Sequence, residues 1–247
     1  TAVPADLLAE GFHFYDGNQD IVEGQTGQTL TGPVTVGAAR WTEFADTAWY
    51  DGQKSEFTLT TAEQLAGLAK LVNGGENFQN KIVKLGADID LRAHDWAPIG
   101  NKAGKSFQGE FDGRSHAITG MNVTGDWFYA GLFGAVGMGT VHDLTLDGNV
   151  AAVKSSGNAL VGGLAGYVYG DSQVYNALFT GTVSLSGMNG VAGGLVGRLE
   201  SSALRNSAAL AEVTVGPVGS SVSFRNIYII YAGDLVGGMS DSNRTGV

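Results

Sequence analysis

Three short strings with the pattern Gly-Leu-x-Gly recur along the chain at a nearly constant spacing. They are Gly131-Leu132-Phe133-Gly134, Gly163-Leu164-Ala165-Gly166 and Gly194-Leu195-Val196-Gly197, and they start 32 and 31 residues apart. A looser copy, Asp234-Leu235-Val236-Gly237, follows them. A fixed period of this length is typical of repeat architectures. The spacing therefore predicts stacked units of about 30 residues each.

Two further features recur with the same period. Each string is followed by an apolar residue and, two positions later, by Asp or Asn; these acid or amide positions are Asp143, Asn176, Asn206 and, more weakly, Asn226. A short alternating strand closes each unit, as in Leu144-Thr145-Leu146. The unit thus holds two or three short strands and no helical pattern. Such a unit cannot bury its apolar face alone, so neighbouring units must stack and share a core.

One turn of a parallel β-helix meets these requirements. We expect the glycines to stand at corners, where a residue without a Cβ can take a positive φ; these corner positions are Gly131, Gly134, Gly163, Gly166, Gly194 and Gly197. The Asp and Asn positions would stack into a ladder of side chains. Leu132, Leu164 and Leu195 would form an interior column. The predicted fold class is all-β, a right-handed parallel β-helix with an N-terminal capping helix at about 61–73.

The composition excludes several other classes. Glycine supplies 39 of 247 residues, yet it does not occupy every third position as in collagen, and 43% hydrophobic content argues against disorder. The absence of cysteine excludes a disulfide framework and a Cys-ligated zinc site. A net charge of −10 disfavours binding to nucleic acid. No apolar run approaches the roughly 18 residues that a membrane span needs, so we expect no membrane insertion.

A helix and less regular strands precede the repeats. Thr60 or Thr61 can cap this helix and Gly74-Gly75 can end it. Its apolar stripe consists of Leu65, Leu68, Ala69 and Val72. We expect it to close the open end of the solenoid, where unpaired strand edges would invite aggregation. The predicted division is 1–56 as a strand-rich extension or cap, 57–130 as helix and irregular first rungs, and 131–247 as repeats with an atypical last rung.

These features resemble the GLUG-repeat proteins of bacterial cell surfaces. The resemblance runs from about residue 57 to 213 and becomes loose beyond Val213. It implies a secreted or surface-anchored bacterial protein in which this region is a β-solenoid stalk or adhesive module. The family repeat has no established catalytic residues, so we expect a non-enzymatic module that is extracellular or at the cell surface. Its expected partners are a ligand on a host or neighbouring cell, or further modules and copies of the same protein.

Four acidic residues are candidates for a chemical site. Asp88 and Asp90 lie two apart on an expected strand, so both carboxylates face the same way, and Glu110 and Asp112 repeat the pattern. Paired carboxylates can bind calcium or act on a glycosidic bond. We favour solvent-facing strand and turn positions for all four, with calcium as the first alternative. A carbohydrate-binding or carbohydrate-active protein is a further alternative, and no catalytic residue and no other cofactor are predicted.

The histidines offer weaker metal candidates. The zinc motif HExxH is absent, and the pairs His94-Asp95 and His142-Asp143 are adjacent in sequence. Adjacent residues on a strand point to opposite faces, so we expect neither pair to chelate a metal easily.

Aromatic residues gather before the regular repeats: Trp41, Trp49, Tyr50, Trp96, Trp127, Phe128 and Tyr129. An exposed strip of them would suit stacking on sugar rings, but we favour burial in the core of the cap.

The most strand-prone apolar segment lies near the C-terminus, at 224–231. It is either a buried last rung or an edge that pairs with another chain or the next module. The interface residues would be Phe224, Ile227, Ile229 and Tyr231. In that case the chain would be a subunit of a self-assembling filament or layer joined through its termini.

Overall fold

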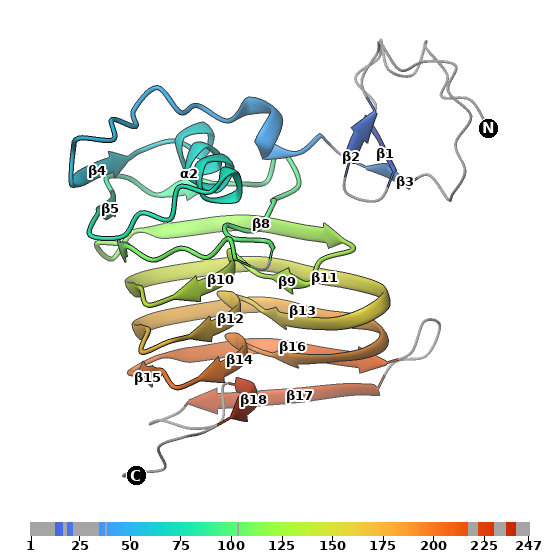
Figure 1. The fold of residues 1–247 in the computed structure, drawn as a ribbon. Coiled ribbons are helices and arrows are strands. Elements are labelled where there is room, and N and C mark those ends of the chain that lie inside the picture. The colour runs from blue at the N-terminus through green and yellow to red at the C-terminus, as the bar shows by residue number, and fades with distance from the viewer. Residues whose placement is uncertain are drawn as a thin grey trace.

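A computed structural model describes residues 13–16, 19–21, 35–37, 39–102, 104–216, 222–229 and 236–240 (Figure 1). Side chains are described within 39–102, 104–154, 158–186 and 190–216. Tyr231, one of the predicted interface residues, lies outside the described residues.

The chain winds into stacked turns with two main sheets (Figure 1). In the larger sheet the order is β17-β16-β13-β11-β7-β5-β4. Its strands are β4 (Glu56–Leu59), β5 (Ile82–Leu85), β7 (Glu110–Asp112), β11 (Thr140–Gly162), β13 (Gln173–Gly193), β16 (Ala208–Gly216) and β17 (Val222–Ile229). Short strands beside this path are β6 (Ile89–Asp90), β8 (Ala117–Gly125), β9 (Tyr129–Ala130) and β15 (Ala203–Arg205).

The second sheet is parallel and contains β10 (Phe133–Gly137), β12 (Ala165–Tyr169), β14 (Val196–Glu200) and β18 (Val236–Ser240). A separate antiparallel sheet is formed by β1 (His13–Asp16), β2 (Gln19–Ile21) and β3 (Thr35–Gly37).

The predicted parallel β-solenoid with a helix near its N-terminus is confirmed. None of the helices among the described residues is both long and apolar enough to cross a membrane.

The strand register explains the sequence period. β11 pairs with β13 from Thr140 opposite Gln173 to Gly162 opposite Gly193, with one irregularity between Lys154 and Asn158. Paired residues of β11 and β13 are 33 positions apart in sequence before the irregularity and 31 apart after it. The Gly-Leu-x-Gly strings that follow these strands, at Gly163 and Gly194, are therefore also 31 residues apart.

The interior column predicted from the repeats is present. Leu132, Leu164 and Leu195 are 0%, 1% and 0% exposed. Their backbones are joined from turn to turn, since the Leu164 N–H donates to the Leu195 carbonyl and the Phe133 N–H donates to the Leu164 carbonyl. Stacking of the turns therefore continues one core through the repeats.

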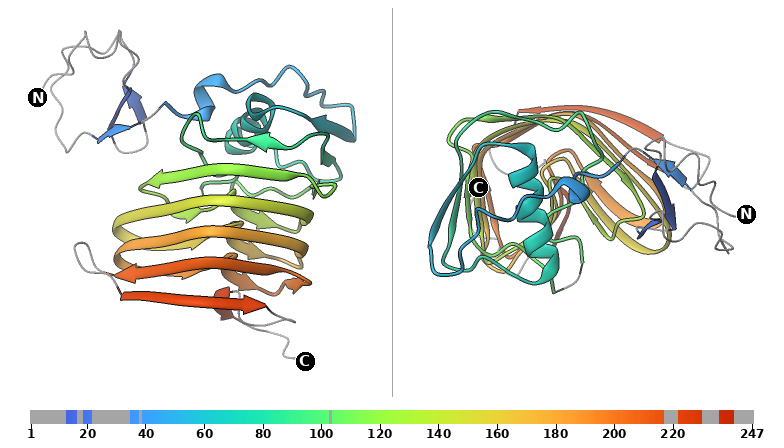
Figure 2. Two further views of the ribbon diagram at one scale, coloured as in Figure 1. Left: turned by 180° about the vertical axis from the view of Figure 1, so that it is seen from behind. Right: turned by 90° about the horizontal axis from the view of Figure 1, so that it is seen from above.

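The N-terminal end is covered by α2 (Ala62–Gly74), which lies across the coil when seen along its axis (Figure 2, right). Thr61 caps the helix by accepting a hydrogen bond from the Gln64 N–H, and Gly75 ends it in the left-handed conformation with φ 119°. The helix buries Leu65, Leu68, Ala69 and Val72. The predicted capping signals and apolar stripe are thus confirmed. A short 3-10 helix, η2 (Trp41–Phe44), precedes it.

The corner glycines are required for a reason that differs from the predicted one. Gly163 and Gly194 lie in the bends between strands, whereas Gly166 and Gly197 lie inside β12 and β14. Of the six corner positions only Gly131 has a positive φ, so the expectation of positive φ is wrong for the other five. Their common property is close approach. A Cβ on Gly166 would lie 2.4 Å from the Leu160 carbonyl oxygen, which leaves no room for a side chain.

The last turn departs from the repeat. β17 runs antiparallel to β16, so Asn226 lies opposite Ala211 and does not stack on Asn206. The expectation that Asn226 continues the ladder is therefore wrong. β18 then returns to the parallel arrangement, with Val236 opposite Val196. Because β17 lies between β14 and β18 in the chain, Val236 follows Val196 by 40 residues, whereas the Gly-Leu-x-Gly strings start 32 and 31 residues apart.

Candidate functional site

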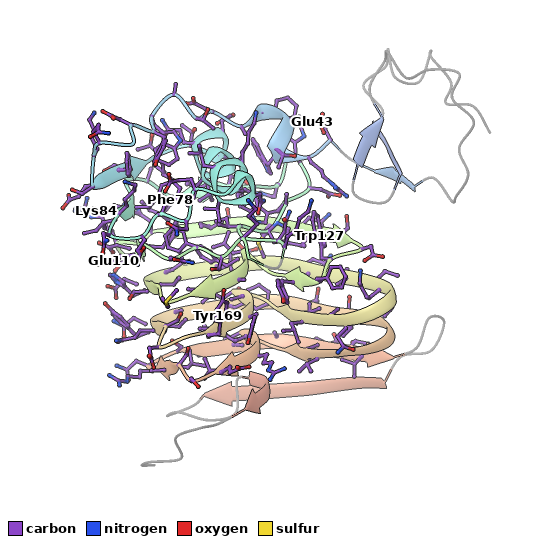
Figure 3. The ribbon with its side chains drawn as sticks, in the orientation of Figure 1. Glu43, Phe78, Lys84, Glu110, Trp127 and Tyr169 are labelled. Carbon is purple, nitrogen blue, oxygen red and sulfur yellow. The ribbon has the colours of Figure 1, made fainter. Side chains whose placement is uncertain are left out.

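The candidate site lies where β7, β11 and β13 begin, on the face of the large sheet that carries polar side chains. Asp112, His142, Tyr175 and Arg205 occupy consecutive paired positions across this sheet. Lys84 stands opposite Asp112 on β5 and forms an ion pair of 2.7 Å with Glu56. Figure 3 shows Lys84 and Glu110 together at one side of the solenoid, with Trp127 toward the other.

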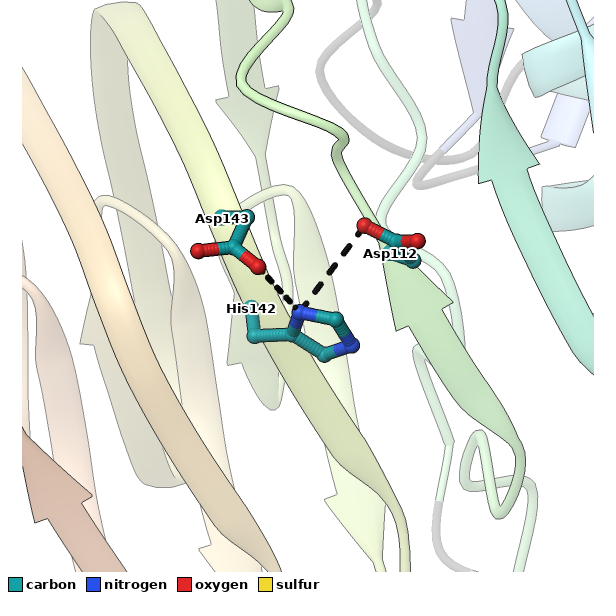
Figure 4. Close-up of side chains that lie close together, drawn as sticks. All are labelled: Asp112, His142 and Asp143. Carbon is teal, nitrogen blue, oxygen red and sulfur yellow. Dashed lines mark hydrogen bonds and ion pairs between the residues drawn. The ribbon is translucent and has the colours of Figure 1, made fainter.

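His142 is the centre of this group. Its side chain is 9% exposed, and Nδ1 lies 2.8 Å from Asp143 Oδ2 and 3.8 Å from Asp112 Oδ1 (Figure 4). Nε2 lies 3.3 Å from Glu110 Oε1. The imidazole also stacks on the Tyr175 ring, with centroids 4.7 Å apart and planes at 7°. Nδ1 is therefore held by Asp143 of the same strand, whereas Nε2 and one ring face are held by the neighbouring strands β7 and β13.

The contact between His142 and Asp143 contradicts the expectation that these adjacent residues point to opposite faces of the strand. Asp143 has φ 53°, in the left-handed region, and this breaks the alternation of side chains along β11. Its carboxylate consequently returns to the side of His142. Asp and Asn are the residues that tolerate this conformation best, because their short polar side chains bond locally.

The same conformation recurs at the next two units. Asn176 has φ 52° and Asn206 has φ 45°. Asn176 Nδ2 donates to Asp143 Oδ1 over 2.8 Å, so the structure brings these two predicted ladder positions together. Among the described side chains, no hydrogen bond joins Asn206 to Asn176. The repeated Asp or Asn thus marks a left-handed bend in each unit, and a side-chain bond joins the first two bends.

A second ladder was missed in the sequence. Asn149 Nδ2 donates to Asn122 Oδ1 over 3.0 Å, and Asn122 Nδ2 donates to Asp95 Oδ1 over 2.6 Å. The Thr182 hydroxyl donates to Asn149 Oδ1, which extends the row to β13. The four residues are of three types, and their steps of 27, 27 and 33 residues differ from the 31 to 32 residue period, so comparing the sequence with itself does not reveal them. The pairing of Asn122, Asn149 and Thr182 across the strands is the property that they share.

The electrostatics of the cluster favour the ionised form of Asp143. Hydrogen bonds from His142 and Asn176 hold the pKa of the Asp143 carboxyl below its ordinary value. Burial, together with the charges of Asp143, Glu110 and Asp112, raises the pKa of the Tyr175 phenol. Tyr175 therefore stays neutral beside the anionic group.

The four acids weighed from the sequence do not form one site. Asp88 accepts hydrogen bonds from the Ala117 N–H and from His116 Nδ1, and the first of these does most to lower its pKa. Asp90 is engaged by the Arg92 guanidinium, whose hydrogen bonds lower the pKa of Asp90. Glu110 and Asp112 instead converge on His142. Calcium binding by these acids stays a prediction.

The chemistry of the cluster suits a cation between its strands. Asp112, His142 and Asp143 offer ligand atoms within 4.8 Å of one another, the one such group among residues with described side chains. Carboxylate and imidazole ligands suit a divalent metal, and Glu110 at Nε2 would then orient the ring from outside. Each imidazole nitrogen faces a carboxylate oxygen, Nδ1 that of Asp143 and Nε2 that of Glu110. The group therefore joins β7 to β11.

The aromatic residues divide into two groups. Trp41, Trp96 and Trp127 are buried, and each indole N–H donates to a backbone carbonyl. These three side chains are buried, as we expect from the sequence for aromatic residues of the cap. Phe128 differs, because it is 52% exposed.

The fold and its repeats define a class: a parallel β-solenoid with glycine-dependent turns and polar ladders on its surface. The family model of the GLUG motif matches residues 157–184, which span the end of β11, β12 and the first half of β13. The resemblance seen in the sequence is therefore confirmed, and the chain carries the GLUG motif.

Two individual proteins are also similar. A protein of Evansella cellulosilytica, provisionally named Gly-rich membrane protein, is 35% identical over 126 residues, which cover 48% of this chain and 14% of the relative. The chain thus corresponds to a small part of that relative's length. A solved chain from Bacteroides ovatus, provisionally named an immunoglobulin A1 protease, is 15% identical with a TM-score of 0.45. That comparison covers 81% of this chain and 87% of the other.

Proposed function

We propose that the chain is a non-enzymatic structural and adhesive module of a bacterial protein that is secreted or held at the cell surface. The observation that carries this proposal is the row of side-chain hydrogen bonds from Asp95 through Asn122 and Asn149 to Thr182. It joins consecutive turns on the outside of the solenoid, while the column of leucines joins them inside.

This arrangement suits a stiff spacer. Each turn is fixed to its neighbours by backbone bonds, by a shared core and by surface side chains, so bending the rod would break several kinds of contact together. The similarity to a glycine-rich protein that carries the word membrane in its name supports a place at the cell envelope. Because the chain matches 14% of that relative, further modules are expected as its covalent or non-covalent partners.

Adhesion can be tested with the purified chain coupled to fluorescent beads. We expect beads that carry the chain to be retained on host epithelial cells or on bacterial cells above the level of beads coated with an unrelated protein of equal negative charge. Retention no higher than this control on every surface would contradict the adhesive role. Release of reducing ends from polysaccharides by the chain would contradict the non-enzymatic part.

Assembly into a filament or layer is the second candidate. One observation favours it: β17 is the outermost strand of the large sheet and has a single partner, β16, among the described strands. Its other edge offers backbone donors and acceptors to a further strand. Joining of chains through this edge would lengthen the rod without changing its core.

A further inference from the structure

A groove beside the cap differs in character from the rest of the molecule. It lies between α2, the start of η2 and the segment that joins β8 to β9, and its volume is about 900 Å³. This volume falls within the range of ligand-binding pockets. The predicted acid sites and the His142 cluster do not line it.

The charge of the groove is opposite to that of the chain. Arg40, Lys70, Lys102 and Lys154 line it together with a single acid, Asp126, whereas the whole chain carries −10. Asp126 is paired with Lys154. Lys70 and Lys102 are exposed and form no ion pair with the residues that the structure describes. Two cationic side chains are therefore available to an anionic ligand.

An aromatic ring stands at the edge of these cations. Phe128 is 52% exposed and lines the groove, and the Lys154 ammonium lies 3.7 Å from its ring centroid. Lys154 itself is 5% exposed, so the ring is supported by a buried cation that is held by Asp126. Next to it, the buried Trp127 ring lies 5.3 Å from the Arg40 guanidinium. The groove thus presents the exposed Phe128 ring as a flat apolar surface, and the Lys154 ammonium packs against that ring.

A polar atom in the lining also lacks a partner. Asn101 Oδ1 is buried and makes no hydrogen bond within the described structure. The Asn101 backbone is fixed, because its N–H donates to Asn73 Oδ1 over 3.0 Å. A buried acceptor without a donor is unfavourable, so a turn of the Asn101 side chain that brings Oδ1 to a ligand hydroxyl would relieve that cost.

We propose that this groove binds an acidic saccharide, the ligand class that combines a carboxylate, a ring face with C–H groups and several hydroxyl donors. Lys70 and Lys102 would attract the carboxylate, and the Phe128 ring would pack against the sugar ring. Asn101 would accept from a hydroxyl once its side chain turns toward the groove. The inference rests on the proposed adhesive function, for which it supplies the ligand class.

Isothermal titration of the intact chain with a trimer of galacturonic acid tests the proposal. We expect binding that weakens with added salt, and no measurable binding of the neutral galactose trimer at the same concentrations. Phe128→Ala and Lys102→Ala should each weaken the affinity by about tenfold, as expected for loss of one stacking or one charge-assisted contact. Phe44→Ala and Lys54→Ala are matched controls, because both side chains are exposed and lie outside the groove lining.

Several results would overturn the proposal. These are equal binding of the neutral trimer, uronate binding that both groove variants leave unchanged, and binding of inorganic phosphate or triglutamate as strong as that of the uronate. The bead assay separates this inference from the proposed function. Retention of beads without uronate binding would contradict the ligand class alone, whereas uronate binding without retention would contradict adhesion alone.

Discussion

Asn176 Nδ2 donates to Asp143 Oδ1 over 2.8 Å, and both residues adopt the left-handed backbone conformation, with φ 52° and 53°. The bond joins two bends that occupy the same place in successive turns. Asp or Asn thus serves two purposes at this position: it tolerates the left-handed bend, and its side chain bonds to the next turn.

The first prediction concerns Asn176. Asn176→Ala removes the bond to Asp143 and places a Cβ-bearing, non-polar residue at positive φ, so we expect a loss of about 1–3 kcal/mol in the free energy of unfolding. Asn176→Gly removes the same bond but accepts the conformation, so its loss should be smaller. Chemical denaturation of the three proteins measures the difference. Equal losses in the two variants would show that the left-handed bend costs nothing.

The second prediction concerns the contribution of Asp143 to stability as the pH falls. The pKa of Asp143 is lower in the folded state than its ordinary value of 3.8, so the carboxylate's stabilising contribution is fully present above that value. It is lost as the pH falls through the lowered folded pKa. Asp143→Asn should therefore be less stable than the natural chain at pH 6, and the gap should narrow at pH 3. Thermal unfolding at both values tests this, and a gap that widens on acidification would contradict it.

The third prediction compares two glycines. Gly166→Ala would place its Cβ 2.4 Å from the Leu160 carbonyl oxygen, a backbone atom that cannot move freely, so we expect a loss of about 1–3 kcal/mol. Gly74 lies in the last turn of α2, and a Cβ there would meet nothing within 4 Å. Gly74→Ala should be neutral or stabilise the protein by up to about 1 kcal/mol. If both substitutions had the same effect on denaturant unfolding, close approach would not explain the repeat glycines.

The fourth prediction concerns the outer edge of the large sheet. Ile229 lies opposite Ala208 at one end of β17, and Ile229→Lys places a charge on this edge strand. If the edge joins chains, the natural protein should form larger species as its concentration rises, and the variant should remain monomeric in analytical ultracentrifugation. Val153→Lys is the control, because Val153 is 47% exposed but lies on the inner strand β11. A natural chain that stays monomeric at all concentrations would exclude the filament.

The sequence predicted those features that follow from identical residues at a constant period. The leucine column and the parallel stacking are of this kind, and the capping helix follows from its own local signals at Thr61 and Gly75. The role of Gly166 could not be read in the same way, because the atom that excludes a side chain belongs to Leu160 and approaches only in the folded chain.

The site was less accessible to sequence reasoning for a related reason. Strand alternation separates His142 from Asp143, and only the left-handed φ of Asp143 brings them together. The row from Asp95 to Thr182 uses three residue types, so it carries no repeat signal. The antiparallel β17 likewise depends on a reversal of chain direction that strand propensity alone does not indicate.

In the proposed function, cross-turn side-chain bonds help this solenoid to act as a spacer that resists tension. Single-molecule force spectroscopy, with the chain held between two well-characterised reference domains, tests it most directly. We expect a distinct unfolding peak for the natural chain and a lower unfolding force for Asn149→Ala, which loses its bonds to Asn122 and Thr182. Extension of the natural chain without a peak, or an unchanged force in the variant, would contradict it.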